Sequence, residues 1–127
     1  MRLFIAIDLG AAARAAIHRR QRRLAAAPSV DASALRFVRE EHLHLTLVFL
    51  GGVDDGRVGE VKAALEPPVD DPPFVLGFGG IGVFPPRGAP RVLWLDVVEG
   101  REATIRLQAS LAARLEAIGI PGEDRPF

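Results

Sequence analysis

Two histidines and a threonine occupy every second position of an apolar stretch, His42-Leu43-His44-Leu45-Thr46-Leu47. Side chains alternate between the two faces of a strand, so His42, His44 and Thr46 would share one face and the leucines the other. The leucine face is suited to packing. The other face would present imidazoles that titrate near neutral pH beside a hydroxyl group, and these groups can transfer protons and hold a phosphoryl oxygen. His-x-Thr alone is a weak pattern, and polar residues at the rim of a core strand are the alternative.

Other chemistries find little support in the sequence. There are no cysteines, which excludes disulfides and thiolate metal sites. Two histidines at positions i and i+2 have no third ligand nearby, so we expect no metal. Glycines 77, 79, 80 and 82 do not stand between a strand and a helix, which argues against a dinucleotide or Walker-type loop. We therefore expect no cofactor.

Length and composition indicate one globular domain over residues 1–127, with 49% hydrophobic and 25% charged residues. No apolar run approaches the roughly 20 residues of a membrane span. The first eight residues alternate and end on Asp8, unlike a signal peptide. We therefore expect a soluble cytoplasmic protein without a membrane partner.

The net charge is zero, but the charges are unevenly distributed. Residues 1–50 contain eight arginines and four acidic residues, whereas residues 51–127 contain eight basic and twelve acidic residues. The histidines lie in the positive half, which suits an anionic ligand. A solvated surface explains the same charges equally well.

Hydrophobic periodicity predicts strands at 3–9, 35–38, 42–50 and 91–98, and helices at 11–27, 54–65 and 101–118. Residues 74–84 are apolar but rich in glycine, which indicates a bent or bulged strand. Asp54 or Asp55 is expected to cap the second helix, and Gly119 to end the third. The resulting order is β-α-β-β-α-β-β-α. It predicts an α+β fold of antiparallel sheets with helices on the outer face.

Aromatic and arginine side chains offer further contacts to a nucleic acid. Phe49, Phe84 and Trp94 could stack on a base, although we expect each to pack in the core. The helix at 11–27 carries five arginines that could attract RNA or simply be solvated: Arg14, Arg19, Arg20, Arg22 and Arg23.

The chain resembles the 2H phosphoesterases, and within them the RNA 2′,3′-cyclic phosphodiesterases that are also described as 2′-5′ RNA ligases. The resemblance extends over nearly the whole chain in the expected order. It rests on five segments: Arg2-Leu3-Phe4-Ile5-Ala6-Ile7-Asp8-Leu9, Leu43-His44-Leu45-Thr46-Leu47-Val48-Phe49-Leu50-Gly51, Gly82-Val83-Phe84-Pro85, Pro90-Arg91-Val92-Leu93-Trp94-Leu95 and Arg125-Pro126-Phe127.

The resemblance implies a two-lobed fold in which two His-x-Thr-x motifs face each other across a cleft. It implies that His44 is the proton donor to the leaving ribose oxygen and that Thr46 binds the phosphate. The substrate would be RNA or a nucleotide with a 2′,3′-cyclic phosphate, which is hydrolysed to a 2′-phosphate without a metal. Ligation of RNA ends through a 2′-5′ linkage would be a possible second activity.

The 127 residues contain only the first of these motifs, since Arg125-Pro126-Phe127 resembles the lead-in to the second. We therefore interpret the chain as C-terminally incomplete, with its last strand or strands missing. Hydrolysis needs one proton removed and one delivered, and each transfer is worth typically about 10²–10⁴-fold, so one imidazole would leave activity severely reduced. The alternatives are a domain that only binds nucleotides or RNA ends, and an inactive truncated product. An open sheet edge would also permit self-association.

Overall fold

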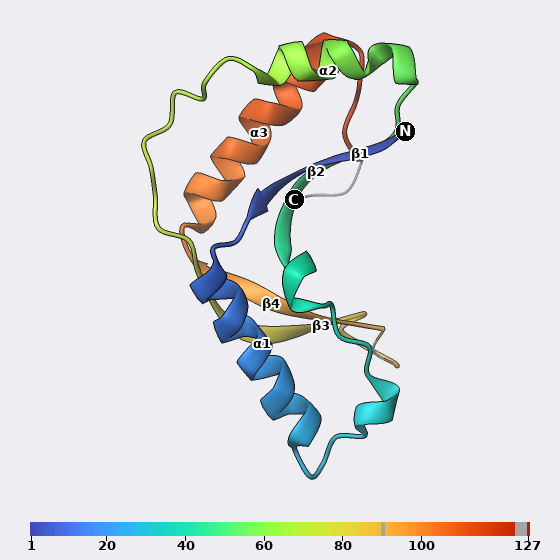
Figure 1. Ribbon diagram of the computed structural model, residues 1–127, viewed down its shortest axis with the longest axis vertical. Coiled ribbons are helices and arrows are strands. Elements are labelled where there is room, and N and C mark those ends of the chain that lie inside the picture. Colours follow the sequence, from blue (N-terminus) through green and yellow to red (C-terminus); the bar gives the residue numbers. More distant parts are fainter. Residues whose placement is uncertain (90, 124–126) are drawn as a thin grey trace.

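The computed structural model of the chain describes residues 1–89, 91–123 and 127. These residues form two antiparallel two-stranded sheets, β1–β2 and β3–β4, and three α-helices (Figure 1). The α+β class predicted from the sequence is confirmed. In chain order the strands and helices are β1 (Arg2–Asp8), α1 (Ala11–Ala26), β2 (His44–Gly52), α2 (Val58–Leu65), β3 (Gly77–Phe84), β4 (Val92–Glu99) and α3 (Arg101–Ala117). Short 3-10 turns occur at η1 (Ala32–Ala34), η2 (Glu40–His42) and η3 (Asp55–Arg57).

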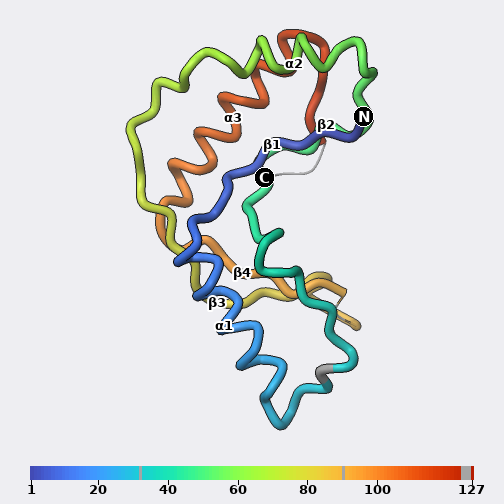
Figure 2. Tube along the Cα trace, viewed as in Figure 1, coloured from blue at the N-terminus to red at the C-terminus, as the bar shows by residue number. Residues whose placement is uncertain are grey.

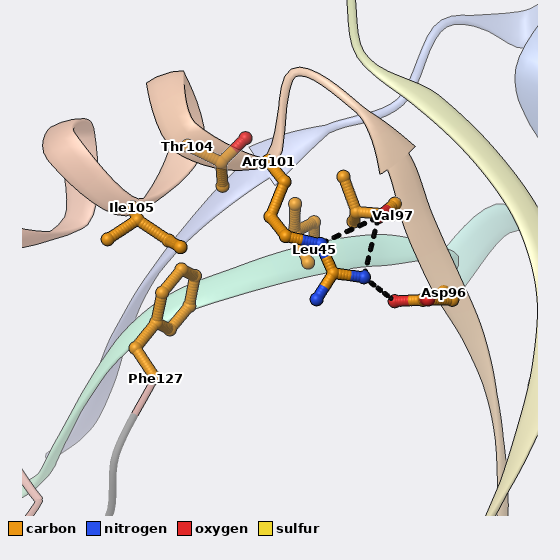
Figure 3. Close-up of a pocket in the computed structure, with 7 residues that line it drawn as sticks. All are labelled: Leu45, Asp96, Val97, Arg101, Thr104, Ile105 and Phe127. Carbon is orange, nitrogen blue, oxygen red and sulfur yellow. Dashed lines mark hydrogen bonds and ion pairs between the residues drawn. The ribbon is translucent and has the colours of Figure 1, made fainter.

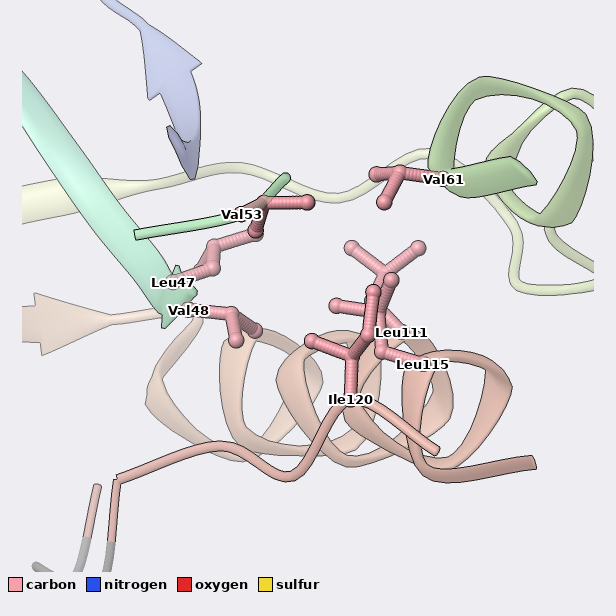
Figure 4. Close-up of a cluster of buried hydrophobic side chains, with 7 residues drawn as sticks. All are labelled: Leu47, Val48, Val53, Val61, Leu111, Leu115 and Ile120. Atoms are coloured by element: carbon pink, nitrogen blue, oxygen red, sulfur yellow. The ribbon is translucent and has the colours of Figure 1, made fainter. Parts of the chain in front are cut away.

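The main core lies between the β1–β2 sheet and the helices α2 and α3 (Figure 4). Leu115 of α3 is the most deeply buried member, with 1% of its surface exposed. The core cluster consists of Leu47, Val48, Val53, Val61, Leu111, Leu115 and Ile120. From β1, Leu3, Ile5 and Ile7 pack against this cluster.

The alternate residues of β1 therefore point away from the core. They are Arg2, Phe4, Ala6 and Asp8, and we call the side of the β1–β2 sheet that carries them the open face. Residues directly opposite each other in an antiparallel pair lie on the same face. Asp8 is paired with His44, Ala6 with Thr46 and Phe4 with Phe49, so these three residues of β2 belong to the open face too.

Strand β2 carries two bulges relative to β1. Ala6 is paired with Thr46, but the next residue, Ile5, is paired with Val48, so Leu47 is an additional residue in β2. The same occurs at Leu50. Because of the first bulge, the consecutive residues Leu47 and Val48 are both buried in the core. The first bulge also reverses the alternation at Val48 and Phe49, and the second bulge, at Leu50, restores it.

The second sheet is bulged as the glycine-rich sequence predicts, with register shifts in β3 between Gly77 and Phe78 and between Phe78 and Ile81. A Cβ atom at Gly82 would overlap the ring of Trp94, its partner on β4, so the close approach of this ring requires glycine. Helix α1 lies beside this sheet, and Ile17 and Leu24 line a hollow of about 200 Å³ together with Trp94. Figure 2 shows the chain turning back after α3 toward β2.

Three local expectations are wrong. Residues 35–38 form no strand; instead, the carbonyl of Val38 accepts a hydrogen bond from Nε2 of Gln21 on α1 (3.1 Å). The side chain of Asp54 does not cap the turn that precedes α2, although its backbone carbonyl accepts from the N–H of Arg57 (2.8 Å). Asp55 lies in this turn and its carboxylate accepts from the N-terminal ammonium (3.2 Å).

The third wrong expectation concerns His42, which lies in the turn η2 and not on the strand. By contrast, the predicted end of α3 is confirmed, since Gly119 has a φ of +77°. Its N–H donates to the carbonyl of Glu116 (2.9 Å). The quoted residues Pro90, Arg125 and Pro126 lie outside the described residues. Within the described ranges, no helix is long and apolar enough to cross a membrane.

Candidate functional site

His44 and Thr46 lie side by side along β2 on the open face, as the sequence predicts. His44 begins the strand opposite Asp8, and Thr46 follows opposite Ala6. The His44 side chain is exposed and that of Thr46 is half-buried. An imidazole and a hydroxyl group are therefore presented on the same side of one strand, with the core holding the other side in place.

The imidazole of His44 is oriented by the backbone of His42. Its Nδ1 atom lies 2.6 Å from the carbonyl oxygen of His42. A carbonyl oxygen only accepts hydrogen bonds, so Nδ1 is the donor. Nε2 is then the ring nitrogen that can exchange a proton with a ligand. The sequence pattern indicated that His42 lies beside His44, but not that its carbonyl contacts the ring.

An aromatic ring covers one side of this imidazole. The ring of Phe4 is stacked on His44, with 5.3 Å between the ring centroids and 27° between the planes. Phe49 contacts the same phenylalanine at 6.2 Å, with an interplanar angle of 41°. Half of the surface of each phenylalanine is exposed, 53% for Phe4 and 50% for Phe49. The open face thus combines a proton-transfer group with accessible aromatic surface.

The expectation that Phe49, Phe84 and Trp94 are core residues is wrong. All three are exposed. For Phe49 the reason is the bulge at Leu47, which turns it to the open face. Phe84 and Trp94 belong to the β3–β4 sheet, and several other apolar residues of that sheet are exposed as well, among them Ile81 and Val92. Of these three residues, Phe49 alone shares a face with His44.

The turn η2 carries a negatively charged side chain, that of Glu41. The carboxylate of Glu41 lies 2.7 Å from the guanidinium of Arg39. The pKa of Glu41 is lowered from its ordinary value, chiefly by the hydrogen bond from its own backbone N–H, with smaller contributions from Arg39, His42 and His18. Glu41 is therefore ionised at neutral pH. This turn presents the His42 carbonyl to His44.

A hollow of about 380 Å³ lies next to Thr46, between β2, α3 and the C-terminal segment. Thr46 and Phe49 line it from β2, and Gln108 and Glu116 from α3. Phe127 also lines it. Among the described residues β2 is paired with β1 alone, so its other edge is free of a strand partner.

A different hollow, of about 150 Å³, lies at Leu45, which precedes Thr46 and points to the opposite face (Figure 3). Its arginine, Arg101, is committed to the fold. The guanidinium donates to the carboxylate of Asp96 (2.5 Å) and to the carbonyl of Val97 (2.9 Å), which joins the start of α3 to β4. The hydroxyl of Thr104 donates to the carbonyl of Gly100 (2.7 Å). Because these hydrogen bonds engage the polar side chains of this hollow within the fold, we assign the hollow a structural role.

The described residues contain no group of three or more His, Asp or Glu side chains that could hold a metal ion. The remaining histidine, His18, is hydrogen-bonded to Gln21 within α1, at 3.4 Å. It lies on α1, whereas the pair lies on β2. On the open face, His44 and Thr46 thus lie beside the two phenylalanines and Asp8, which is paired with His44.

Comparison with known proteins identifies the same segment. A model of the family described as LigT-like phosphoesterase matches residues 7–94, which include His44 and Thr46. An RNA 2′,3′-cyclic phosphodiesterase of Archaeoglobus fulgidus is 36% identical over 119 residues, covering 94% of this chain and 64% of that protein. One from Methanothermobacter thermautotrophicus is 35% identical over 124 residues, covering 97% of this chain and 65% of that protein.

A solved structure is similar as well. The crystal structure of TT0787 of Thermus thermophilus has a TM-score of 0.76 and 30% sequence identity, covering all of this chain and 69% of the other. The chain spans slightly less than two thirds of the two curated relatives. The family match covers well over half of the chain and includes its His-x-Thr segment. The resemblance seen in the sequence is thus confirmed, and the chain belongs to the LigT-like phosphoesterases, which are 2H phosphoesterases.

Proposed function

We propose that the protein is an RNA 2′,3′-cyclic phosphodiesterase in which His44 is the proton donor and Thr46 binds the phosphate. The observation that carries this proposal is the orientation of His44. Its Nδ1 is bound to the His42 carbonyl, which leaves Nε2 for proton exchange on the face that Thr46 shares. The relatives named above are RNA 2′,3′-cyclic phosphodiesterases, which supports the choice of substrate.

The proposed reaction follows from the two groups. Water attacks the phosphorus of the cyclic phosphate, and the bond from phosphorus to the ribose 3′-oxygen breaks. The imidazolium of His44 gives its Nε2 proton to that oxygen, while the Thr46 hydroxyl donates a hydrogen bond to a non-bridging phosphoryl oxygen. The product is a 2′-phosphate and a free 3′-hydroxyl. The same opening of the cyclic phosphate by the 5′-hydroxyl of a second RNA, in place of water, would join RNA ends in a 2′-5′ linkage and release the 3′-hydroxyl.

The proton removed from water needs a second acceptor. His18 is bonded to Gln21 within α1, and His42 lies in the turn on the same side as His44. His42 is two residues from His44 along the chain and would approach a ligand from the same side, whereas an in-line displacement needs the base on the other side. The resemblance assigns this base to a second His-x-Thr-x motif, which the 127 residues do not contain.

A second candidate function is the binding of nucleotides or RNA ends without turnover. The phosphate-binding half of the chemistry needs only Thr46 and the charged form of His44. Phe49 offers a half-exposed ring on the same face for a base to stack on. We propose a cytoplasmic location for either function, because RNA is the proposed ligand.

The free edge of β2 supports a third arrangement, in which two chains associate and bring their His44 residues together. Sedimentation equilibrium of the 127-residue chain distinguishes this dimeric arrangement from the two candidate functions of a single chain. A concentration-dependent dimer whose specific activity rises with dimer fraction would support it, and a strictly monomeric chain would exclude it.

Incubation with cytidine 2′,3′-cyclic phosphate, followed by identification of the product, tests the main proposal. Formation of the 2′-phosphate without added metal is expected. Formation of the 3′-phosphate would contradict the proposed bond cleavage. A titration with cytidine 2′-phosphate serves as the companion measurement. Saturable binding without turnover would favour the binding function, and neither turnover nor binding would contradict both candidates.

A further inference from the structure

We propose that Phe4 is a positioning residue that holds the His44 imidazole in the plane required for proton donation. This inference rests on the proposed function of His44. Its evidence is the stacked arrangement of the two rings, with centroids 5.3 Å apart and planes 27° apart. These values lie within the range of offset-stacked aromatic pairs, whose centroids are typically about 4.5–7 Å apart.

The His42 carbonyl alone does not fix the ring of His44. A hydrogen bond at Nδ1 restricts the side-chain torsions of His44, but it tolerates a range of angles and so sets the tilt of the ring plane only in part. A second ring stacked on the imidazole narrows this range of tilt. Together the His42 carbonyl and the Phe4 ring determine where Nε2 points, and proton transfer depends on that direction.

The residue between Phe4 and the site permits this stacking. Along the open face of β1, Phe4 is followed by Ala6 and then by Asp8, which is paired with His44. A methyl group at position 6 leaves room for the rings of Phe4 and His44 to meet above it. A larger residue there would stand between them.

Packing of the core does not account for Phe4. The side chains of β1 that pack against the core cluster are Leu3, Ile5 and Ile7. Phe4 points to the opposite face and keeps 53% of its surface exposed. Its aromatic neighbours are His44 and Phe49, both on the open face. The ring therefore has its contacts where the proposed chemistry takes place.

NMR spectroscopy of the His44 ring protons tests this positioning directly in the 127-residue chain. A stacked phenyl ring shifts the resonances of the imidazole carbon-bound protons by its ring current. We expect this shift to be lost in Phe4→Leu and retained in Phe4→Tyr. Ala6→Val should reduce it. Phe84→Leu is the matched control, because Phe84 is 59% exposed and lies on the other sheet, and it should leave the His44 resonances unchanged.

The same variants are compared in hydrolysis of cytidine 2′,3′-cyclic phosphate. Phe4→Leu is expected to lower kcat by about 10- to 100-fold with a smaller change in KM, and Phe4→Tyr to restore it. Amide spectra establish that each variant is folded. Unchanged His44 resonances in a folded Phe4→Leu chain, or a lost ring-current shift with full kcat, would overturn the proposal.

If the wild-type chain does not hydrolyse the substrate, the proposed function fails, but the positioning role of Phe4 can still be tested. Cytidine 2′-phosphate then serves as the probe, with the resonances of His44 as the readout. The positioning proposal expects the phosphate to shift the His44 resonances in wild type and Phe4→Tyr, and at least tenfold weaker binding in Phe4→Leu. Equal binding by all three folded chains would overturn it.

Discussion

Thr46 and Phe49 lie on the same face of the β1–β2 sheet, although three positions separate them along the strand. Regular alternation would place them on opposite faces. The bulge at Leu47 corrects the parity, since Ala6 is paired with Thr46 and Phe4 with Phe49. One additional residue thereby brings an aromatic ring to the face that carries the imidazole and hydroxyl groups. Bulges commonly redirect a side chain next to a functional site, and this one fits that pattern.

Replacement of Phe49 tests whether this ring serves a ligand. In Phe49→Ala, we expect binding of cytidine 2′-phosphate to weaken by about 1–3 kcal/mol, the range found for loss of one base-stacking ring. The free energy of unfolding should fall by less than that, because half of the ring is already in water. Isothermal titration and urea unfolding measure the two quantities. A loss of stability without a loss of affinity would assign Phe49 to the fold alone.

Substitution can distinguish the hydrogen-bonding role of the Thr46 hydroxyl group from the effect of its side-chain shape. Thr46→Val keeps the branched side chain but removes the donor, so affinity for a 2′-phosphate should fall by about 1.5–3 kcal/mol, as expected for a hydrogen bond to a charged group. Thr46→Ser keeps the donor and is the matched control. Titration of both variants with cytidine 2′-phosphate gives the comparison, and equal affinities would remove Thr46 from the phosphate site.

The core between β2, α2 and α3 should depend strongly on Leu115. Leu115→Ala removes a side chain that is 1% exposed and is expected to lower the free energy of unfolding by about 2–5 kcal/mol. Ile105→Ala on the same helix is the comparison, since Ile105 is 44% exposed and its truncation should cost much less. Urea denaturation followed by circular dichroism measures both. Similar losses for the two variants would contradict this description of the core.

Two glycines should respond to alanine in opposite directions. Gly59→Ala lies within α2 and meets no atom within 4 Å, so we expect a gain of about 0.5–1 kcal/mol from helix propensity. Gly82→Ala would overlap the Trp94 ring and should cost about 1–3 kcal/mol. Thermal unfolding and Trp fluorescence report both effects. A neutral Gly82→Ala with unchanged fluorescence would show that the ring does not cover this glycine.

Most helices and strands could be predicted from periodicity, because long apolar stripes such as Leu107, Leu111 and Leu115 determine which side of a helix is buried. The segment at 35–38 could not, since a strand needs a partner and the Val38 carbonyl is instead satisfied by Gln21. A capping aspartate was likewise predicted from residue type. Instead, the Asp55 carboxylate accepts a hydrogen bond from the N-terminal ammonium, which is distant in sequence.

For the site, the shared face of His44 and Thr46 followed from the two-residue period alone. The bulge that turns Phe49 outward depends on pairing with β1, which no local pattern reveals. The contact from Phe4 to His44 joins residues 40 positions apart in the sequence and requires the register of both strands. The sequence signals this contact only by Phe4 itself, an apolar residue at a β1 position that alternates away from the core.

The most direct test of the account is the rate at which His44→Ala opens a 2′,3′-cyclic phosphate at the end of a short RNA, relative to the wild-type chain under identical conditions. Loss of the proton donor should lower the rate by about 10²–10⁴-fold. His18→Ala is the control, since His18 is bonded to Gln21 on α1, and it should retain the wild-type rate. Equal rates for His44→Ala and wild type would contradict the role proposed for His44.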